Sequence, residues 1–188
     1  MDMLRNTIET LKSKLEIPQD YEIYFVSSAT ECWEIITQSL VKTSSLHIYN
    51  GAFGEKWKEY TQHIKPGAKG VSFEYNTLPD FDSMPLNAGE DVVWITHNET
   101  SNGTALPASV ISDLRSRTGQ IVAVDATSSM AGVSLPWRDA DVWYASVQKC
   151  FGLPAGLAVM VASPRAIQKA QEVADRSFYN SFLFIRDN

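Results

Sequence analysis

Apolar and polar positions along the chain follow two alternating patterns. Short runs of apolar, β-branched and aromatic residues have the length and composition of buried β-strands. These runs cover 24–26, 46–49, 71–75, 92–96, 121–124, 142–145 and 157–161. Between most of them, apolar residues recur at three- and four-residue spacing, which predicts helices over 7–15, 31–41, 55–64, 108–117 and 165–174. The alternation is typical of an α/β protein with a largely parallel sheet.

The first predicted strand is followed by a helix start signal. Ser28 and Glu31 fit the Ser-x-x-Glu capping box, so a helix is expected to begin directly after 24–26. A helix N-terminus presents unpaired N–H groups and a partial positive charge, and small residues let an anion approach the backbone. This layout predicts a phosphate-binding turn.

The last two predicted strands are joined by a short loop. The connection between 142–145 and 157–161 is too short for a helical crossover, so these strands are expected to be antiparallel. Lys149 then lies in this connection.

Length and composition indicate one globular domain over 1–188. Apolar residues make up 44% and charged residues 20%, close to the averages for soluble proteins. A net charge of −6 without a Lys/Arg-rich cluster argues against a nucleic-acid partner. No run approaches 18 apolar residues, and the first residues lack the layout of a signal peptide, so no membrane partner and a cytoplasmic location are expected.

Cysteine and histidine spacing gives no sign of a metal site. Cys32 and Cys150 are too far apart for a CxxC pair and are expected to be thiols in a reducing compartment. His47, His63 and His97 have no cysteine or carboxylate at ligand spacing, so no metal is predicted. The chain also lacks the glycine motifs of dinucleotide and P-loop sites.

Two residues suggest a particular cofactor chemistry. Asp125 ends the apolar run 121–124, and Lys149 lies in a loop bounded by glycine and proline. Pyridoxal phosphate (PLP) needs a lysine amine to hold its aldehyde as a Schiff base and a carboxylate to pair with its ring nitrogen. Each residue alone has an ordinary explanation, because such aspartates often bond to turns and most loop lysines are solvated. Both are expected at strand ends of one sheet, where open α/β sheets build their sites.

Neighbouring residues are chemically suited to the same cofactor. Gln148 can donate to a ring oxygen, and Ser146 is a candidate phosphate donor, although either could be a turn residue. Thr100 lies in a polar segment after a strand and is either a cofactor contact or part of a turn. Phe53 could stack on a pyridine ring or belong to the core.

Three stretches resemble a known family. They are 97–103 (HNETSNG), 124–129 (VDATSS) and 146–156 (SVQKCFGLPAG), in the family's order and approximate spacing. Together they resemble class V PLP-dependent aminotransferases, and within these the phosphoserine aminotransferase-like group. The resemblance implies that Lys149 is the Schiff-base lysine, Asp125 the partner of the ring nitrogen and Phe53 the stacking aromatic. It also implies that Gln148 and Thr100 contact the ring oxygen or phosphate, and that Ala29 and Thr30 form the phosphate-binding turn.

The resemblance also implies a fold and an activity. The fold is the large domain of the type I aminotransferase fold, a three-layer α/β/α arrangement on a mixed, mostly parallel sheet, which usually works as a homodimer. The reaction moves an amino group between an amino acid, such as O-phosphoserine, and a 2-oxo acid, such as 2-oxoglutarate. The family's polypeptide is roughly twice as long, so its N-terminal segment and C-terminal small domain are expected to be missing here.

Departures from the family pattern leave two alternatives. The family commonly has glycines, and in phosphoserine aminotransferases an arginine, where this chain has 28–30, and its stacking residue is typically tryptophan rather than Phe53. One alternative is another class V enzyme such as a desulfurase or lyase, although Cys150 beside a rigid lysine is poorly placed to accept sulfur. The other is a non-catalytic or incomplete PLP-fold fragment.

Overall fold

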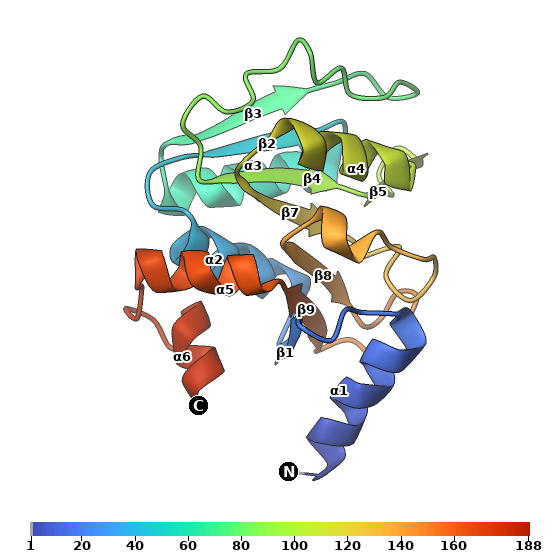
Figure 1. The fold of residues 1–188 in the computed structure, drawn as a ribbon. Helices are drawn as coiled ribbons and strands as arrows, with labels where there is room; N and C mark the ends of the chain where they lie inside the picture. The colour runs from blue at the N-terminus through green and yellow to red at the C-terminus, as the bar shows by residue number, and fades with distance from the viewer. Residues whose placement is uncertain (1) are drawn as a thin grey trace.

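A seven-stranded mixed sheet forms the centre of the protein, and the computed structural model describes residues 2–188 (Figure 1). The strand order is β1-β9-β8-β7-β4-β2-β3. Their bounds are β1 (Glu22–Val26), β2 (Ser45–Tyr49), β3 (Ala68–Ser72), β4 (Val92–Thr96), β7 (Ile121–Asp125), β8 (Val142–Ser146) and β9 (Ala158–Ala162). β9 runs antiparallel to both β8 and β1, and the other pairs are parallel. The predicted antiparallel pair is therefore confirmed.

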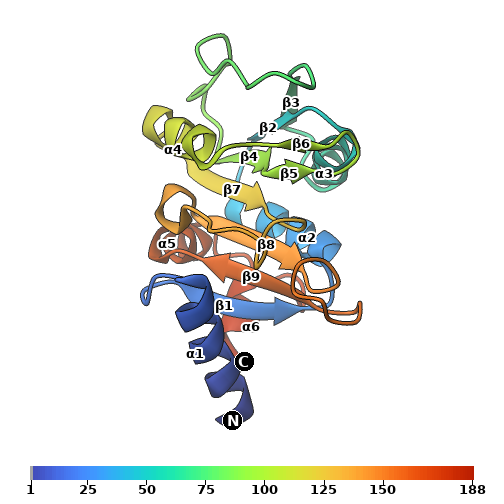
Figure 2. The ribbon, with the colours of Figure 1, turned by 90° about the vertical axis from the view of Figure 1, so that its right-hand side faces the viewer.

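A second, small sheet follows β4. Its two antiparallel strands are β5 (Asn98–Glu99) and β6 (Thr104–Ala105), which form a short hairpin over residues 98–105. Figure 2 shows this hairpin beside β4 and close to α3 (Ala52–Ile64). The polar segment around Thr100 is thus the turn of an ordered hairpin.

Helices cover both faces of the large sheet. They are α1 (Asp2–Leu15), α2 (Ala29–Leu40), α3, α4 (Ala108–Arg117), α5 (Pro164–Val173) and α6 (Phe182–Asp187), with a 3-10 turn at Trp137–Asp139. One core contains α4 and partly buried residues of α1, and the other contains α2, α3, α5 and α6. Alternate residues of the strands enter the two cores: Val93 and Ile95 point into the first, and Val92 and Trp94 into the second. The three-layer α/β/α fold expected from the sequence is confirmed.

The apolar runs succeeded as strand signals because β4, β7, β8 and β9 are buried along their whole length. The strand prediction at 71–75 was partly wrong, since β3 is Ala68–Ser72. Its pairing with β2 ends where Tyr49 meets Ser72. The Phe73 N–H still donates to the Tyr49 carbonyl at 3.0 Å, and beyond this residue the chain leaves the sheet. Because β3 is an edge strand with exposed residues, its apolar pattern is weak. The short helix α6 was missed.

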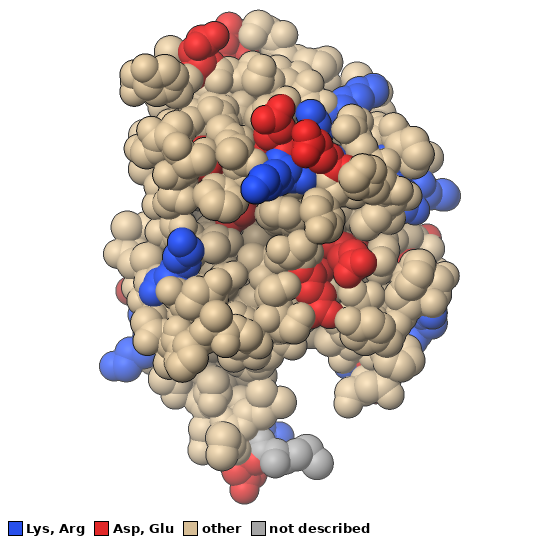
Figure 3. Space-filling model, turned by 180° about the vertical axis from the view of Figure 1, so that it is seen from behind, with Lys and Arg blue, Asp and Glu red and all other residues tan. Residues whose placement is uncertain are grey.

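Figure 3 shows one face of the molecule, over which Lys and Arg are spread; near its centre, basic and acidic residues lie side by side. Among the helices of residues 2–188, none is both long and apolar enough to cross a membrane. Both cysteines are free thiols, as expected.

Candidate active site

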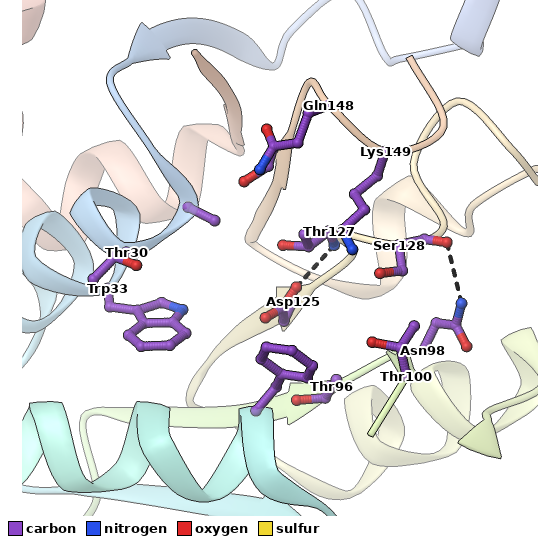
Figure 4. Close-up of a pocket in the computed structure, with 13 residues that line it drawn as sticks. Thr30, Trp33, Thr96, Asn98, Thr100, Asp125, Thr127, Ser128, Gln148 and Lys149 are labelled. Atoms are coloured by element: carbon purple, nitrogen blue, oxygen red, sulfur yellow. Dashed lines mark hydrogen bonds between the residues drawn. The ribbon is translucent and has the colours of Figure 1, made fainter. Parts of the chain in front are cut away.

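A pocket of about 190 Å³ opens at the carboxyl ends of the central strands (Figure 4). β4, β7 and β8 each contribute their last residue, and the first turns of α2 and α3 contribute the facing side. The lining residues are Ala29, Thr30, Trp33, Phe53, Thr96, Asn98, Thr100, Asp125, Thr127, Ser128, Ser146, Gln148 and Lys149. All eight residues proposed from the sequence, Ser146 included, are among them. They come from five separate segments of the chain, the first at Ala29 and the last ending at Lys149.

Asp125 is the most buried charged group of the pocket. It is the last residue of β7, is 6% exposed, and its Oδ1 accepts the backbone N–H of Thr127 at 2.8 Å. Burial raises the pKa of Asp125, and the backbone hydrogen bond from Thr127 only partly offsets this. Within residues 2–188, Asp125 has no ion-pair partner. A cationic group placed against it would therefore stabilise its charged form.

Two hydroxyl groups of the pocket lack partners. Thr96 Oγ1 and Thr127 Oγ1 are buried and form no hydrogen bond with the described residues. Thr96 is paired in register with Asp125 of the adjacent strand, and Thr127 follows Asp125 by two residues. Buried polar atoms without partners are costly. The pocket thus offers unused hydrogen-bonding capacity around a buried carboxylate, which fits a polar, cationic ring such as that of PLP.

Lys149 enters the pocket from a rigid loop after β8. The loop is held by hydrogen bonds from Gly152 N to the Lys149 carbonyl (2.9 Å) and from Leu153 N to the Val147 carbonyl (3.1 Å). Gly152 has φ +68°, a conformation that a side chain would strain. Figure 4 shows the Lys149 side chain extending toward Thr127 and Asp125. Two residues that are 24 positions apart in β7 and the β8–β9 loop therefore face one cavity.

The N-terminus of α2 forms another side of the pocket. Ser28 is the N-cap, and its hydroxyl accepts the Glu31 backbone N–H at 3.1 Å, as the capping box predicts. The return contact differs from the motif, because Glu31 Oε2 accepts the backbone N–H and hydroxyl of Ser27, both at 2.7 Å, instead of Ser28. Ala29 and Thr30 belong to the first turn, whose N–H groups have no intrahelical acceptor. An anion can be bound there.

Phe53 and Thr100 line the pocket from α3 and from the 98–105 hairpin. Phe53 is in the first turn of α3 and is 43% exposed, so it belongs to the pocket wall and not to the core. Thr100 is in the turn of the 98–105 hairpin and is exposed. Gln148 is also exposed beside Lys149. The structure places these side chains at the pocket; their roles toward a cofactor remain predictions.

Five lining residues were not proposed from the sequence. They are Trp33, Thr96, Asn98, Thr127 and Ser128. Trp33 follows Thr30 by one helical turn, which is a usable signal, but its apolar character made it look like core; its Nε1 donates to the Tyr144 hydroxyl at 2.7 Å. Asn98 Nδ2 donates to the Ser128 carbonyl at 3.1 Å, which joins the hairpin to the segment after β7. No local pattern marks that contact.

Comparison with known proteins identifies the family. The model of the family "Aminotransferase class-V" matches residues 1–183, so the chain belongs to the class V aminotransferases. The phosphoserine aminotransferase of Rhodococcus opacus is 30% identical over 177 residues, covering 93% of this chain and 46% of that protein. That of Nocardioides is 31% identical over 179 residues, covering 92% of this chain and 46% of that protein.

Solved structures agree with this assignment. The crystal structure of a phosphoserine aminotransferase from Cytophaga hutchinsonii superimposes with a TM-score of 0.91 at 31% identity, covering 97% of this chain and 52% of that one. A pyridoxamine-pyruvate aminotransferase from Mesorhizobium loti shares the fold, with a TM-score of 0.81 at 24% identity. The chain spans about half the length of the curated relatives that it matches.

Proposed function

We propose that residues 1–188 form the PLP-binding large domain of an aminotransferase. The observation that carries this proposal is the convergence of Lys149 and Asp125 on one pocket in a chain of the class V family. When bound, PLP supplies an aldehyde that condenses with amines and a protonated ring that accepts electrons. The unpartnered hydroxyls and the unpaired carboxylate described above support a fit to this group.

Seven of the pocket residues have a proposed task. The Lys149 amine would hold the cofactor covalently and, when not bonded to it, would move a proton at the substrate Cα. Asp125 keeps a proton on the ring nitrogen by pairing with its positive charge. The first turn of α2, with Ala29 and Thr30, binds the phosphate through backbone N–H groups and the helix dipole.

The other predicted contacts surround the ring. Phe53 covers a ring face, while Gln148 and Thr100 bond to the ring oxygen or the phosphate. These tasks agree with the position of each side chain in the pocket lining.

The substrate proposal rests on the relatives. Phosphoserine aminotransferases at 30–31% identity favour O-phosphoserine as amino donor and 2-oxoglutarate as acceptor. A homodimer is expected by the same resemblance, and light scattering of the purified protein tests it. Amino-group transfer between these two substrates, followed by chromatography of glutamate, tests the substrate pair.

Visible absorbance of protein mixed with PLP tests the cofactor assignment. We expect a band from the bound cofactor in the wild type and its loss in Lys149→Ala. Lys56→Ala is the matched control, because Lys56 is an exposed lysine of α3 outside the pocket lining. An unchanged band in Lys149→Ala would refute the role of this lysine. Cofactor binding without amino-group transfer would favour a PLP-fold domain without turnover.

A further inference from the structure

A second buried carboxylate lies next to two residues of the pocket. Glu99, in β5, is 1% exposed, and its side chain accepts hydrogen bonds from two directions. Its Oε2 accepts the backbone N–H groups of Phe53 and Gly54, each at 3.1 Å. Its Oε1 accepts the backbone N–H of Ser101 at 3.1 Å and the Ser101 hydroxyl at 2.6 Å. All four donors belong either to the start of α3 or to the 98–105 hairpin.

Helix α3 is capped by this hairpin and not by its own N-cap residue. The N-cap is Gly51, which has no side chain to offer. The N–H of Ala52 donates to the Ser101 hydroxyl at 2.9 Å, and the next two N–H groups donate to Glu99. The first three N–H groups of a helix normally need such acceptors. A carboxylate there is also favoured by the helix dipole.

The turn before α3 and the 98–105 hairpin are packed closely against each other. A Cβ atom on Gly51 would lie 2.6 Å from Ser101 Oγ and no farther from Glu99 Cγ, so only glycine permits the approach. Asn102 Nδ2 donates to the Asn50 carbonyl at 2.7 Å, and Asn50 Nδ2 donates to Thr104 Oγ1 at 3.0 Å. The turn before α3 and the hairpin are thus one connected unit.

We propose that Glu99 is a positioning residue that fixes Phe53 and Thr100 relative to each other. Phe53 carries one of the N–H groups bound by Glu99, and Thr100 directly follows Glu99 in the hairpin. Glu99 does not line the pocket itself. Its carboxylate therefore sets the distance between an aromatic wall and a hydroxyl on the same side of the cavity. We call the hydrogen bonds of Glu99 to the start of α3 and to the 98–105 hairpin the clamp. The consequence for ring binding rests on the proposed function, whereas the clamp does not.

Glu99→Gln isolates this role, because glutamine keeps the volume of the side chain. Its NH2 group replaces one acceptor oxygen and would face an N–H or O–H donor. Glu90→Gln is the matched control, since Glu90 is also buried but lies before β4 and outside the pocket lining. Ser101→Ala is a second variant, which removes the cap of Ala52 and one bond to Glu99 while keeping the carboxylate.

Amide hydrogen exchange followed by mass spectrometry tests the clamp without any cofactor. In Glu99→Gln we expect exchange in peptides covering 51–55 and 98–104 to become roughly tenfold faster or more, as for the loss of a bond to a charged group. Peptides of α4 and α5 should keep their wild-type rates, and Glu90→Gln should leave 51–55 and 98–104 unchanged. Ser101→Ala should act in the same direction with a smaller change. Unchanged exchange in both variants, or an equal increase along the whole chain, would overturn the proposal.

Circular dichroism in the visible band, measured at saturating PLP, tests the consequence for the pocket. A displaced Phe53 or Thr100 should alter the sign or intensity of this band in Glu99→Gln and weaken PLP binding about tenfold. A wild-type spectrum and affinity in this variant would contradict the positioning role. If the wild type gives no band, the proposed function fails, while the exchange comparison still decides whether Glu99 is the clamp.

Discussion

The N-termini of α2 and α3 face the same pocket but are completed in different ways. α2 is capped by its own Ser28, and Ala29 and Thr30 in its first turn line the cavity. α3 begins at a glycine, and its first N–H groups are bound by Ser101 and Glu99 from a hairpin. One N-terminus is therefore available to an anion, and the other already holds a carboxylate. With the proposed function, this difference predicts that a cofactor phosphate binds at the N-terminus of α2 and not at that of α3.

The largest expected effect comes from filling the space between α3 and the hairpin. Gly51→Ala forces a Cβ against Glu99 and Ser101, so we expect a loss of about 1–3 kcal/mol in the free energy of unfolding, as for other overpacked sites. Denaturant unfolding measures it. Gly119→Ala is the control, because apart from its chain neighbours no atom of the described residues lies within 4 Å of the added Cβ. Equal stability of the two variants would show that α3 does not need this close contact.

A negative charge placed at each N-terminus sharpens the comparison. Thr30→Glu should weaken PLP binding roughly tenfold, or about 1.4 kcal/mol, because its carboxylate competes with the phosphate at α2. Pyridoxal, which lacks the phosphate, should lose much less affinity. Ala52→Glu adds the same charge to the first turn of α3, where the N–H groups are already bound, and should leave PLP affinity within about twofold. Titrations of visible absorbance provide these affinities, and equal losses in the two variants would reject the assignment of the phosphate to α2.

The Ser28 cap of α2 should make a smaller free-energy contribution than the contacts tested above. Ser28→Ala removes the acceptor for the Glu31 N–H and should cost about 1 kcal/mol of stability. Urea unfolding against the wild type checks this value. Ser27→Ala is a useful reference, since it leaves the N-cap hydroxyl in place while removing one bond to Glu31. If Ser27→Ala lowers the free energy of unfolding more than Ser28→Ala does, the Glu31 side chain contributes more to capping α2 than the Ser28 hydroxyl.

The pH dependence of stability distinguishes Asp125 from an ordinary paired carboxylate. Because burial raises its pKa, the folded protein binds this proton more tightly than the unfolded chain. Without cofactor, stability should therefore fall as pH rises from the usual aspartate pKa of about 3.9 through the raised value. Asp125→Asn should remove this fall and be more stable than the wild type at pH 7, yet bind PLP more weakly.

Asp91 supplies the opposite case. Burial alone would raise the pKa of Asp91, but the hydrogen bonds from Lys169 and from backbone N–H groups lower it. The stability that Asp91 contributes should therefore be lost as pH falls below about 4. Asp91→Asn should destabilise the protein at pH 7. Thermal unfolding of both variants across pH tests the pair. The same sign of effect for Asp125→Asn and Asp91→Asn at pH 7 would contradict this account.

Sequence alone predicted the parts of the site that depend on local patterns. The strands ending at Asp125 and before Lys149 have apolar runs, and Ser28 carries a capping motif, so their places at one sheet edge could be inferred. The cap of α3 could not be predicted, because Glu99 and Phe53 are far apart in the chain and are brought together by the pairing of β2 with β4. Trp33 and Thr96 were missed because tryptophan is common in cores and threonine is common in strands, so neither residue type by itself marks a site.

Peptide mass spectrometry of the wild-type protein, after PLP and borohydride treatment, tests the central claim most directly. The account predicts a single pyridoxyl group on Lys149, because among residues 2–188 this is the lysine that lines the pocket. A group on exposed lysines such as Lys56, or no group at all, would contradict the assignment of this pocket as a PLP site.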